Sequence, residues 1–251
     1  MYANARGIKG KMACIKSIFS EKKPDIALFT ETHLADNKGM NVDGYTFFGK
    51  ARKKGKGGGV GIFVKNEKKC VVAPHYTQRE LEITWISINR GMENPFYIGV
   101  YYGKQETTCN IATITDEMDK LTEEILELQR EGEVLICMDA NAKIGLMGEE
   151  MSRNGKLITA VFEECELSVI NGTEKCEGTI TRQNRKRKTE RSAIDLVVTS
   201  YQAQEWVKKM IIDESGDFVM QGRNESDHNT ILVDMELSQV PKQSQEDCIE
   251  C

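Results

Sequence analysis

Short apolar runs alternate along the chain with stretches of helical periodicity. Residues 25–29, 60–64 and 96–102 are apolar and bounded by polar or glycine-rich segments, a pattern typical of buried strands. The same reasoning predicts further strands at 42–48, 82–89, 133–138, 168–170, 179–181, 193–199 and 230–235. We expect the strands between residues 42 and 102 to form an antiparallel meander.

Three segments carry apolar residues at helical spacing. Residues 12–19 predict a short helix that ends before Pro24, because proline cannot continue a helix. Residues 114–128 predict a long amphipathic helix with Thr115 as its N-cap, and residues 157–165 predict a third helix. Strand runs with a few helices favour an α/β sandwich, in which two mixed sheets pack face to face with helices outside.

Composition is ordinary for a soluble globular chain, with 251 residues that are 39% hydrophobic and 29% charged. No apolar run approaches the roughly 20 residues of a membrane helix, and no secretory leader is recognisable, so we expect no membrane association. The 8 cysteines form no compact framework, which predicts reduced thiols in an intracellular protein. Neither a repeat nor a second domain is evident, so we expect one domain at 1–237 and a polar tail or linker at 238–251.

Charge is unevenly distributed around a formal net value of −5. Acidic residues concentrate on the predicted helix at 114–128, whereas basic residues cluster at 50–56 and at 182–191. Local field rather than total charge attracts a polyanion, so a basic face for nucleic acid is compatible with a negative sum. A single basic run is more often a solvated loop.

Four carboxylates stand at or near the ends of predicted strands. Glu31, Asp139, Asp195 and Asp227 would be costly to bury unpaired, and oxygen ligands of this kind suit Mg²⁺ or Mn²⁺. His228, beside Asp227, can hold a proton against a phosphate oxygen if a carboxylate orients its ring, and Asp195 is the candidate. One such residue alone is usually a cap or a turn, but the whole ordered set is not explained that way.

Other motifs carry less information about function. His33 follows Glu31 and is expected to support its loop, while His75 is expected in a proline-containing turn without a chemical role. The glycines at 57–59 lack the rest of a phosphate-binding loop, and no Gly-x-Ser-x-Gly nucleophile motif occurs.

The ordered motifs together resemble those of the endonuclease/exonuclease/phosphatase superfamily. They are Asn4-x-Arg6-Gly7, Glu31-Thr32-His33, Gly58-Gly59-Val60-Gly61-Ile62, Tyr101, Asp139-x-Asn141, Ser192-x-Ile194-Asp195 and Ser226-Asp227-His228. Within the superfamily they look most like the apurinic-like endonuclease domain of a non-LTR retrotransposon, where a reverse transcriptase follows on the same polyprotein. The resemblance implies a four-layered, DNase-like α/β sandwich of two mostly antiparallel mixed sheets, with a divalent metal between them.

By the same resemblance each catalytic candidate acquires a role. Glu31 would be the principal metal ligand, with Asn4 close to it as a further ligand, and Asp227 would serve the metal or the histidine. Asp139 would position or deprotonate the attacking water, and Asn141 would hold that water and a phosphate oxygen. Tyr101 would donate to the phosphate or stabilise the leaving oxygen. His228, oriented by Asp195, would bind the scissile phosphate and stabilise its growing charge.

Three features of the chain bear on this resemblance. Only three residues precede Asn4, which predicts a shortened first strand. Tyr101 and Tyr102 are adjacent, so either could face the site; we favour Tyr101. The basic segment corresponds to a hairpin that probes the DNA groove, and its expected DNA-binding residues are Arg182, Arg185, Lys186, Arg187, Lys188, Arg191 and Ser192.

The sequence therefore predicts a monomeric Mg²⁺-dependent DNA endonuclease, for which Mn²⁺ can substitute. It would nick double-stranded DNA to a 3′-hydroxyl and a 5′-phosphate, priming retrotransposon insertion in the nucleus after synthesis in the cytoplasm. Alternatives are an apurinic-site repair endonuclease and a superfamily phosphatase. An inactive, domesticated binding module ranks last, since no catalytic candidate is missing.

Overall fold

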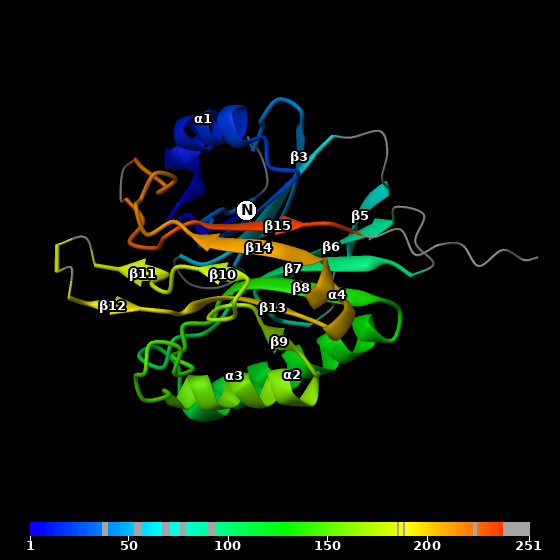
Figure 1. Cartoon of the computed structure of the whole chain (residues 1–251), viewed down its shortest axis with the longest axis vertical. Coiled ribbons are helices and arrows are strands. Elements are labelled where there is room, and N and C mark those ends of the chain that lie inside the picture. The colour runs from blue at the N-terminus through cyan, green and yellow to red at the C-terminus, as the bar shows by residue number, and fades with distance from the viewer. Residues whose placement is uncertain are drawn as a thin grey trace, which may run out of the picture.

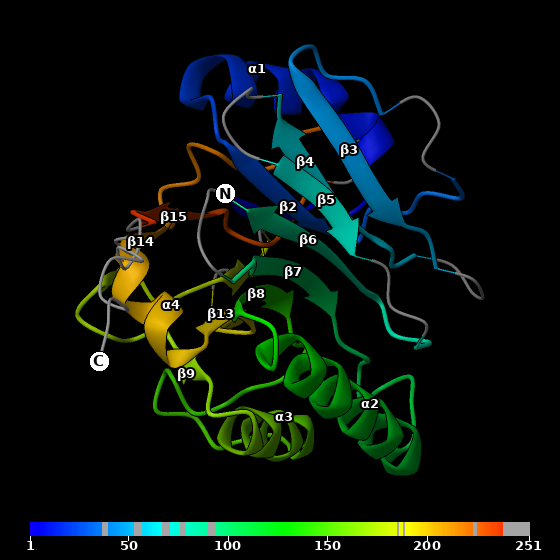
Figure 2. The same cartoon turned by 90° about the vertical axis from the view of Figure 1, so that its right-hand side faces the viewer.

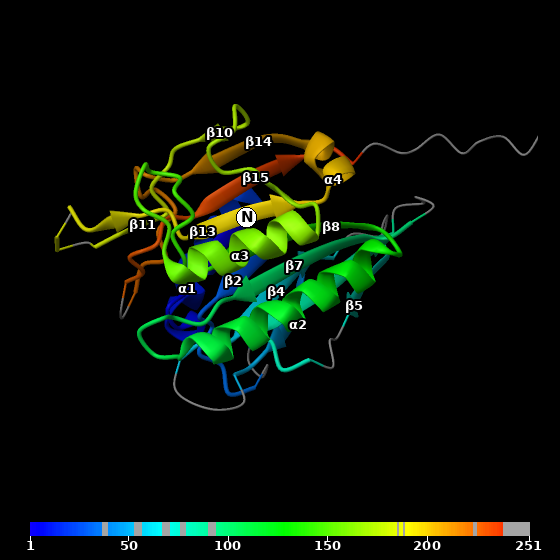
Figure 3. The same ribbon diagram turned by 90° about the horizontal axis from the view of Figure 1, so that it is seen from below.

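Two β-sheets lie face to face between outer helices in the computed structural model (Figure 1). The structure describes residues 1–36, 40–52, 57–66, 71–75, 79–89, 94–184, 186–187, 189–222 and 225–237. Helix α1 covers one sheet, while α2 and α3 lie side by side against the other (Figures 2 and 3). The predicted four-layered α/β sandwich is thus the observed fold.

The first sheet has seven strands in the order β10-β14-β15-β1-β2-β4-β3. Its central strand β1 runs parallel to β2 and antiparallel to β15, so chain segments from both ends of the sequence meet there. The strands are β1 (Tyr2–Asn4), β2 (Ile26–Thr30), β3 (Tyr45–Lys50), β4 (Val60–Lys65), β10 (Cys176–Glu177), β14 (Val207–Ile212) and β15 (Ile231–Met235).

The second sheet has six strands in the order β5-β6-β7-β8-β13-β9. Strands β5, β6 and β7 form the expected antiparallel meander, and β7 then pairs in parallel with β8. The strands are β5 (Val71–His75), β6 (Ile83–Asn89), β7 (Phe96–Tyr102), β8 (Glu133–Asp139), β9 (Ser168–Val169) and β13 (Asp195–Thr199).

The two longest helices begin at capping side chains. α2 (Ile111–Gln129) starts at Asn110, whose side chain accepts from the Thr113 backbone N–H; the prediction of Thr115 as N-cap was wrong because it lies a turn inside the helix. α3 (Arg153–Glu164) is capped in the same way by Ser152. The remaining helices are the 3₁₀ turn η1 (Ile8–Lys11), α1 (Met12–Lys22) and α4 (Tyr201–Trp206).

Strand β7 contributes to two cores because its alternate side chains point to opposite faces of the sheet. Phe96 and Tyr102 lie in the core between the sheets, whereas Tyr97 and Tyr101 lie in the core beneath α2 and α3. Burial on both faces explains why this strand is apolar throughout rather than alternating.

Several predicted elements differ from the structure. Residues 179–181 form no strand; the adjacent pairs Cys176–Glu177 and Arg182–Gln183 do. His75 ends strand β5 instead of lying in a turn. Both α4 and β14 were missed. The expected tail at 238–251 lies outside the described residues.

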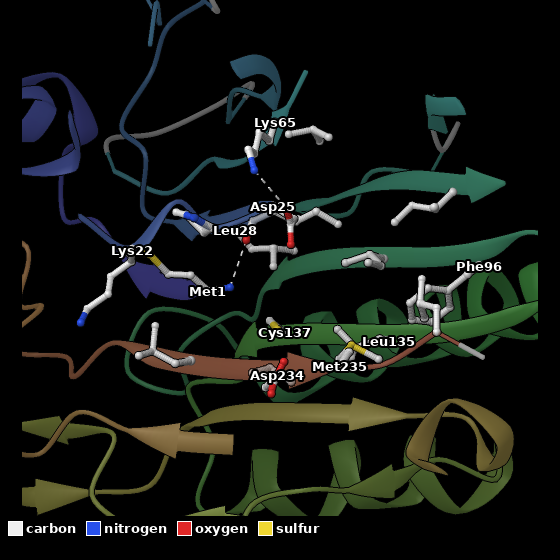
Figure 4. A pocket seen from close by; sticks show the side chains of 18 of the residues that line it. Met1, Lys22, Asp25, Leu28, Lys65, Phe96, Leu135, Cys137, Asp234 and Met235 are labelled. Carbon is white, nitrogen blue, oxygen red and sulfur yellow. Dashed lines mark hydrogen bonds and ion pairs between the residues drawn. The ribbon is translucent and has the colours of Figure 1, made fainter. Parts of the chain in front are cut away.

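A cavity of about 390 Å³ lies near Met1 and is lined by residues of both sheets, among them Leu28 and Leu135 (Figure 4). Strand β1 pairs with β2 from Tyr2 opposite Leu28, and Ile26 of β2 lines the cavity. The Met1 amino group donates to the Ile26 carbonyl at 3.0 Å. In the part of the chain that the structure describes, no helix is both long and apolar enough to span a bilayer.

Candidate active site

Strand direction gathers the polar candidates at one end of the sandwich. Asn4 ends β1 and Glu31 follows β2, its parallel neighbour, so these two residues emerge from the same edge. In the facing sheet Asp139 ends β8, directly opposite Asp195 in the antiparallel strand β13. His228 lies in the segment just before β15.

Asn4 links the two sheets through its side-chain amide. Its Nδ2 donates to Glu31 Oε1 at 3.0 Å and to Asp139 Oδ2 at 2.9 Å, while its Oδ1 accepts from the Arg6 backbone N–H at 3.1 Å. The nitrogen therefore faces the carboxylates. In this arrangement the Asn4 nitrogen holds the two carboxylates in place, and the expected role of Asn4 as a metal ligand stays a prediction.

His228 and Asp195 are in direct contact. Nδ1 of the ring lies 2.8 Å from Asp195 Oδ2, and both residues are buried. Asp195 also accepts from the Tyr2 hydroxyl at 2.8 Å, and its backbone N–H donates to the Thr181 hydroxyl. These contacts fix the carboxylate and with it the ring, as expected for an orienting residue.

Burial disfavours a charge on His228, but the neighbouring carboxylates outweigh it. Desolvation lowers the pKa of the ring, whereas Asp195 and then Asp139 raise it, and the net result is a pKa of about 9. The ring is consequently an imidazolium near neutral pH. Its Nε2 is turned toward Asp139 Oδ2 at 3.9 Å, longer than a hydrogen bond.

Asp139 is a buried carboxyl group that lies close to other carboxylates. Desolvation and the charge of Asp195 raise its pKa to about 7, although His228 lowers it. Its Oδ1 accepts from the Asn141 backbone N–H at 3.1 Å. A carboxyl group with a pKa near neutrality is well matched to take a proton from water.

Tyr102, not Tyr101, faces this site. The Tyr102 hydroxyl lies 3.3 Å from Glu31 Oε1, whereas the Tyr101 hydroxyl donates to Glu117 of α2 at 2.8 Å on the other side of the sheet. The choice of Tyr101 was wrong because successive residues of a strand point to opposite faces. Burial and the charges of Glu31 and Asp139 raise the pKa of Tyr102, so its hydroxyl keeps its proton.

Several residues around the site adopt left-handed backbone conformations. Arg6, Glu31, His33 and Asn141 have φ between 43° and 52° without being glycine. Such conformations are sparsely populated and cluster at functional sites. Asn141 is held by its side chain, which donates from Nδ2 to the Gly103 carbonyl at 2.9 Å.

Asp227 lies outside the carboxylate cluster. Its Oδ1 is 3.2 Å from Arg6 Nη1, and its Oδ2 is 2.8 Å from Arg182 Nη2. Burial raises its pKa, but His228, Arg182 and Arg6 outweigh this effect and lower it. The structure thus directs both Asp227 oxygens to arginines, and the expected service of Asp227 to the metal or the histidine stays a prediction.

The basic segment forms a hairpin at the edge of the site (Figure 1). Strands β11 (Arg182–Gln183) and β12 (Arg191–Ser192) pair antiparallel as a separate ribbon. The ribbon is tied to the histidine segment, because the Gln183 N–H donates to the Asp227 carbonyl at 2.7 Å. Lys186, Arg187 and Arg191 are exposed and Ser192 is buried, while Arg185 and Lys188 lie outside the described residues, as do Lys53, Lys54 and Lys56.

The donor set fits a hard divalent cation. Glu31, Asp139 and His228 each place a ligand atom within 4.8 Å of the others, and two of the three ligands are carboxylates. Because His228 is protonated and tied to Asp195, the carboxylate oxygens are the groups that suit Mg²⁺ or Mn²⁺. His33 Nε2 lies 3.3 Å from Glu31 Oε2 and supports that carboxylate.

Comparison with known proteins identifies the family. A family model described as "Endonuclease-reverse transcriptase" matches residues 96–232, more than half of the chain. The chain belongs to the endonuclease-reverse transcriptase family. The matched segment includes Asp139, Asn141, Asp195 and His228, whereas Asn4 and Glu31 precede it. No curated protein matches the chain.

Solved structures share the fold at low sequence identity. The endonuclease domain of TRAS1, a telomere-specific non-LTR retrotransposon, is 20% identical with a TM-score of 0.68, covering 94% of this chain and 96% of that one. The AP endonuclease LMAP from Leishmania major is 14% identical with a TM-score of 0.76, covering 94% and 87% respectively. The 3′-5′ exonuclease NExo from Neisseria meningitidis is 15% identical with a TM-score of 0.69, covering 94% and 98%.

Sequence reasoning missed Tyr2, Thr181 and the role of Arg6 as an ion-pair partner. Tyr2 and Thr181 form hydrogen bonds with Asp195, which lies 193 and 14 residues away along the chain. Neither residue belongs to one of the ordered motifs. Arg6 was noted only as part of a motif. A prediction that β1 pairs with β15 would have placed Arg6 near the Ser226-Asp227-His228 motif.

Proposed function

We propose that this chain is a metal-dependent DNA endonuclease that nicks one strand of a duplex. The observation that carries the proposal is that Glu31, Asp139 and His228 each place one possible ligand atom within 4.8 Å of the others. The buried Asp195 holds the His228 ring. Hydrolysis of a phosphodiester needs an activated water, a cation on the phosphate and fixed donors for the growing charge. Each need has a matching group in this cluster.

Asp139 activates the water. Its Oδ2 is turned toward His228 Nε2, and its raised pKa of about 7 allows the carboxylate to accept the proton that the attacking water loses. The Asn141 N–H and the Asn4 side chain each donate to one Asp139 oxygen, which fixes the carboxylate plane. Asn141 would hold the water and a phosphate oxygen.

His228 and Tyr102 stabilise the phosphate. The imidazolium Nε2–H donates to a non-bridging oxygen, while Asp195 keeps the ring charged and correctly turned. The Tyr102 hydroxyl, protonated at neutral pH, donates to a second oxygen beside Glu31. Both donors are preorganised by burial, so little reorganisation is needed as charge develops.

Glu31 would hold the Mg²⁺, for which Mn²⁺ can substitute. When bound there, the ion supplies Lewis acidity to the phosphate and charge to the leaving oxygen. Glu31 is suited to this because one of its oxygens is supported by Asn4 and the other by His33. We expect hydrolysis to leave a 3′-hydroxyl and a 5′-phosphate.

We infer a biological setting that the family supports. A reverse transcriptase on the same polyprotein would use the 3′-hydroxyl as primer for target-primed reverse transcription, acting in the nucleus on double-stranded DNA after synthesis in the cytoplasm. Retrotransposon membership is supported by the family model and by the TRAS1 fold match. The exposed hairpin cations Lys186, Arg187 and Arg191 would contact DNA phosphates.

An end-labelled duplex tests the reaction. The protein with Mg²⁺ should produce a nick whose 3′ end a polymerase extends, and both EDTA and His228→Ala should abolish it. Intact duplex with wild-type protein would refute the proposal. A second duplex bearing one abasic site separates the alternatives: cleavage confined to the lesion would favour a repair endonuclease, and release of a terminal phosphate alone would favour a phosphatase.

A further inference from the structure

Two arginines converge on one carboxylate beside the site. Arg6 comes from the loop after β1 and Arg182 from the base of the β11–β12 hairpin, and they bind opposite oxygens of Asp227 at 3.2 and 2.8 Å. The arginine side chains are 49% and 41% exposed, whereas that of Asp227 is 15% exposed. The carboxylate thus lies beneath the two guanidinium groups, which reach the surface.

The backbone around Arg6 is built to hold it there. Arg6 has φ 43°, and its N–H donates to Asn4 Oδ1 at 3.1 Å. Its carbonyl accepts from the ammonium of Lys11 at 2.9 Å, and Lys11 is itself only 1% exposed. The bond from Lys11 holds the left-handed backbone from which the Arg6 side chain extends toward Asp227.

Arg182 is fixed equally firmly. It forms a β-bridge with His228, and flanking hydrogen bonds join Gln183 to Asp227 and Asn229 to Thr181. The two arginines are therefore attached by backbone bonds to the segments that carry Asn4 and His228. Any group that binds both arginines lies next to the reactive phosphate.

We propose that Arg6 and Arg182 form a clamp for a DNA backbone phosphate adjacent to the scissile one, and that Asp227 is a positioning residue for this clamp and not a metal ligand. This inference rests on the proposed function. Each ion pair engages one guanidinium nitrogen, and a guanidinium has five N–H donors in a fork that fits phosphate oxygens. Asp227 neutralises one of the two charges, so the clamp keeps a net positive charge.

Asp227 cannot readily serve a metal in the same arrangement. Both of its oxygens are committed to arginines, and a divalent cation beside them would face two guanidinium charges. Among the residues that the structure describes, the carboxylates of the candidate metal cluster are Glu31 and Asp139. Asp227, which the sequence suggested as a further metal ligand, is therefore assigned to the arginine clamp.

DNA binding tests the clamp on a background that cannot cleave. In Asp139→Asn protein with a fluorescent duplex, Arg6→Ala should weaken binding by about tenfold and reduce the slope of log K against log[salt] by about 0.9. Arg6→Lys should retain the slope but not the full affinity, because the charge remains and the fork is lost. Lys9→Ala, an exposed cation on η1, is the matched control and should change affinity by less than about twofold.

Metal binding tests Asp227 independently of DNA. Titration of DNA-free protein with Mn²⁺, followed by electron paramagnetic resonance, should give the same affinity for Asp227→Asn as for wild type, and a loss of about tenfold or more for Glu31→Gln. An equal loss for Asp227→Asn would overturn its assignment, and unchanged DNA affinity in Arg6→Ala would overturn the clamp. Arg6-dependent binding without any nicking by wild type would instead refute the proposed function and leave the clamp standing.

Discussion

The charge on His228 depends on Asp195, and Asp195→Asn isolates that dependence. The asparagine keeps the size of the side chain and an oxygen that can accept from Nδ1. It removes the negative charge that raises the pKa of the ring, while the desolvation that lowers it stays. We therefore expect the pKa of His228 to fall from about 9 to its ordinary value of 6.5 or below.

The size of this change sets the expected loss of activity. A fall from about 9 to 6.5 corresponds to roughly 3 kcal/mol of interaction with the imidazolium. At about pH 7.5 the protonated fraction would drop from more than about nine-tenths to roughly one-tenth, since one pH unit is a factor of ten. Nicking should then be about tenfold slower near pH 7.5 and recover toward wild type as the pH falls to about 6.

Two assays check this account. The chain has 3 histidines, so ring resonances of His33, His75 and His228 can be assigned by single substitutions and titrated by NMR. The pH profile of nicking gives the second reading: its alkaline limb reports the loss of the His228 proton and should move to lower pH in Asp195→Asn. Its acid limb reports Asp139, and bound Mg²⁺ should place that limb below the metal-free pKa of about 7.

The control is a carboxylate of the same type far from the site. Asp25→Asn removes an exposed charge near Met1 and should leave both the titration and the profile unchanged. A His228 ring that titrates below about 6.5 in the wild type would refute the reasoning. So would an Asp195→Asn protein that is folded and has an unshifted alkaline limb.

Further substitutions separate catalytic from structural side chains. Tyr102→Phe should lower kcat for nicking by about 10²-fold with little change in stability, because it removes a donor at the phosphate. Tyr101→Phe should do the reverse, lowering the free energy of unfolding in urea by about 1–2 kcal/mol as Glu117 loses a buried hydrogen bond; matched kcat losses in both variants would contradict the assignment. Gly132→Ala should destabilise the fold by about 1–3 kcal/mol, since its Cβ would overlap the Pro95 carbonyl, and an unchanged urea midpoint would show that the turn can relax.

Much of the fold was predictable because buried strands and amphipathic helices leave periodic signals. The strand at 96–102 matches β7 at both ends, and the helix at 114–128 lies within α2. β14 was missed because Lys208 and Lys209 interrupt its apolar pattern; both point to solvent. The three residues of β1 are too few for any periodicity.

The site was predictable as a set of strand-end residues, but its contacts were not. Parallel pairing of β1 with β2 brings Asn4 beside Glu31, and no local pattern specifies that pairing. Tyr102 could not be chosen over Tyr101 because β7 is apolar on both faces. Likewise, nothing in the sequence around Asp227 reveals the arginine 221 residues away that binds it.

Plasmid nicking tests the central claim most directly. Supercoiled DNA incubated with Mg²⁺ should become nicked circle with wild-type protein, and neither Glu31→Gln protein nor wild-type protein in EDTA should convert it. Because Glu31 is the expected metal ligand, Glu31→Gln removes the metal while leaving the His228–Asp195 pair intact. Nicking by Glu31→Gln at the wild-type rate, or by wild type in EDTA, would contradict a metal-dependent endonuclease at this site.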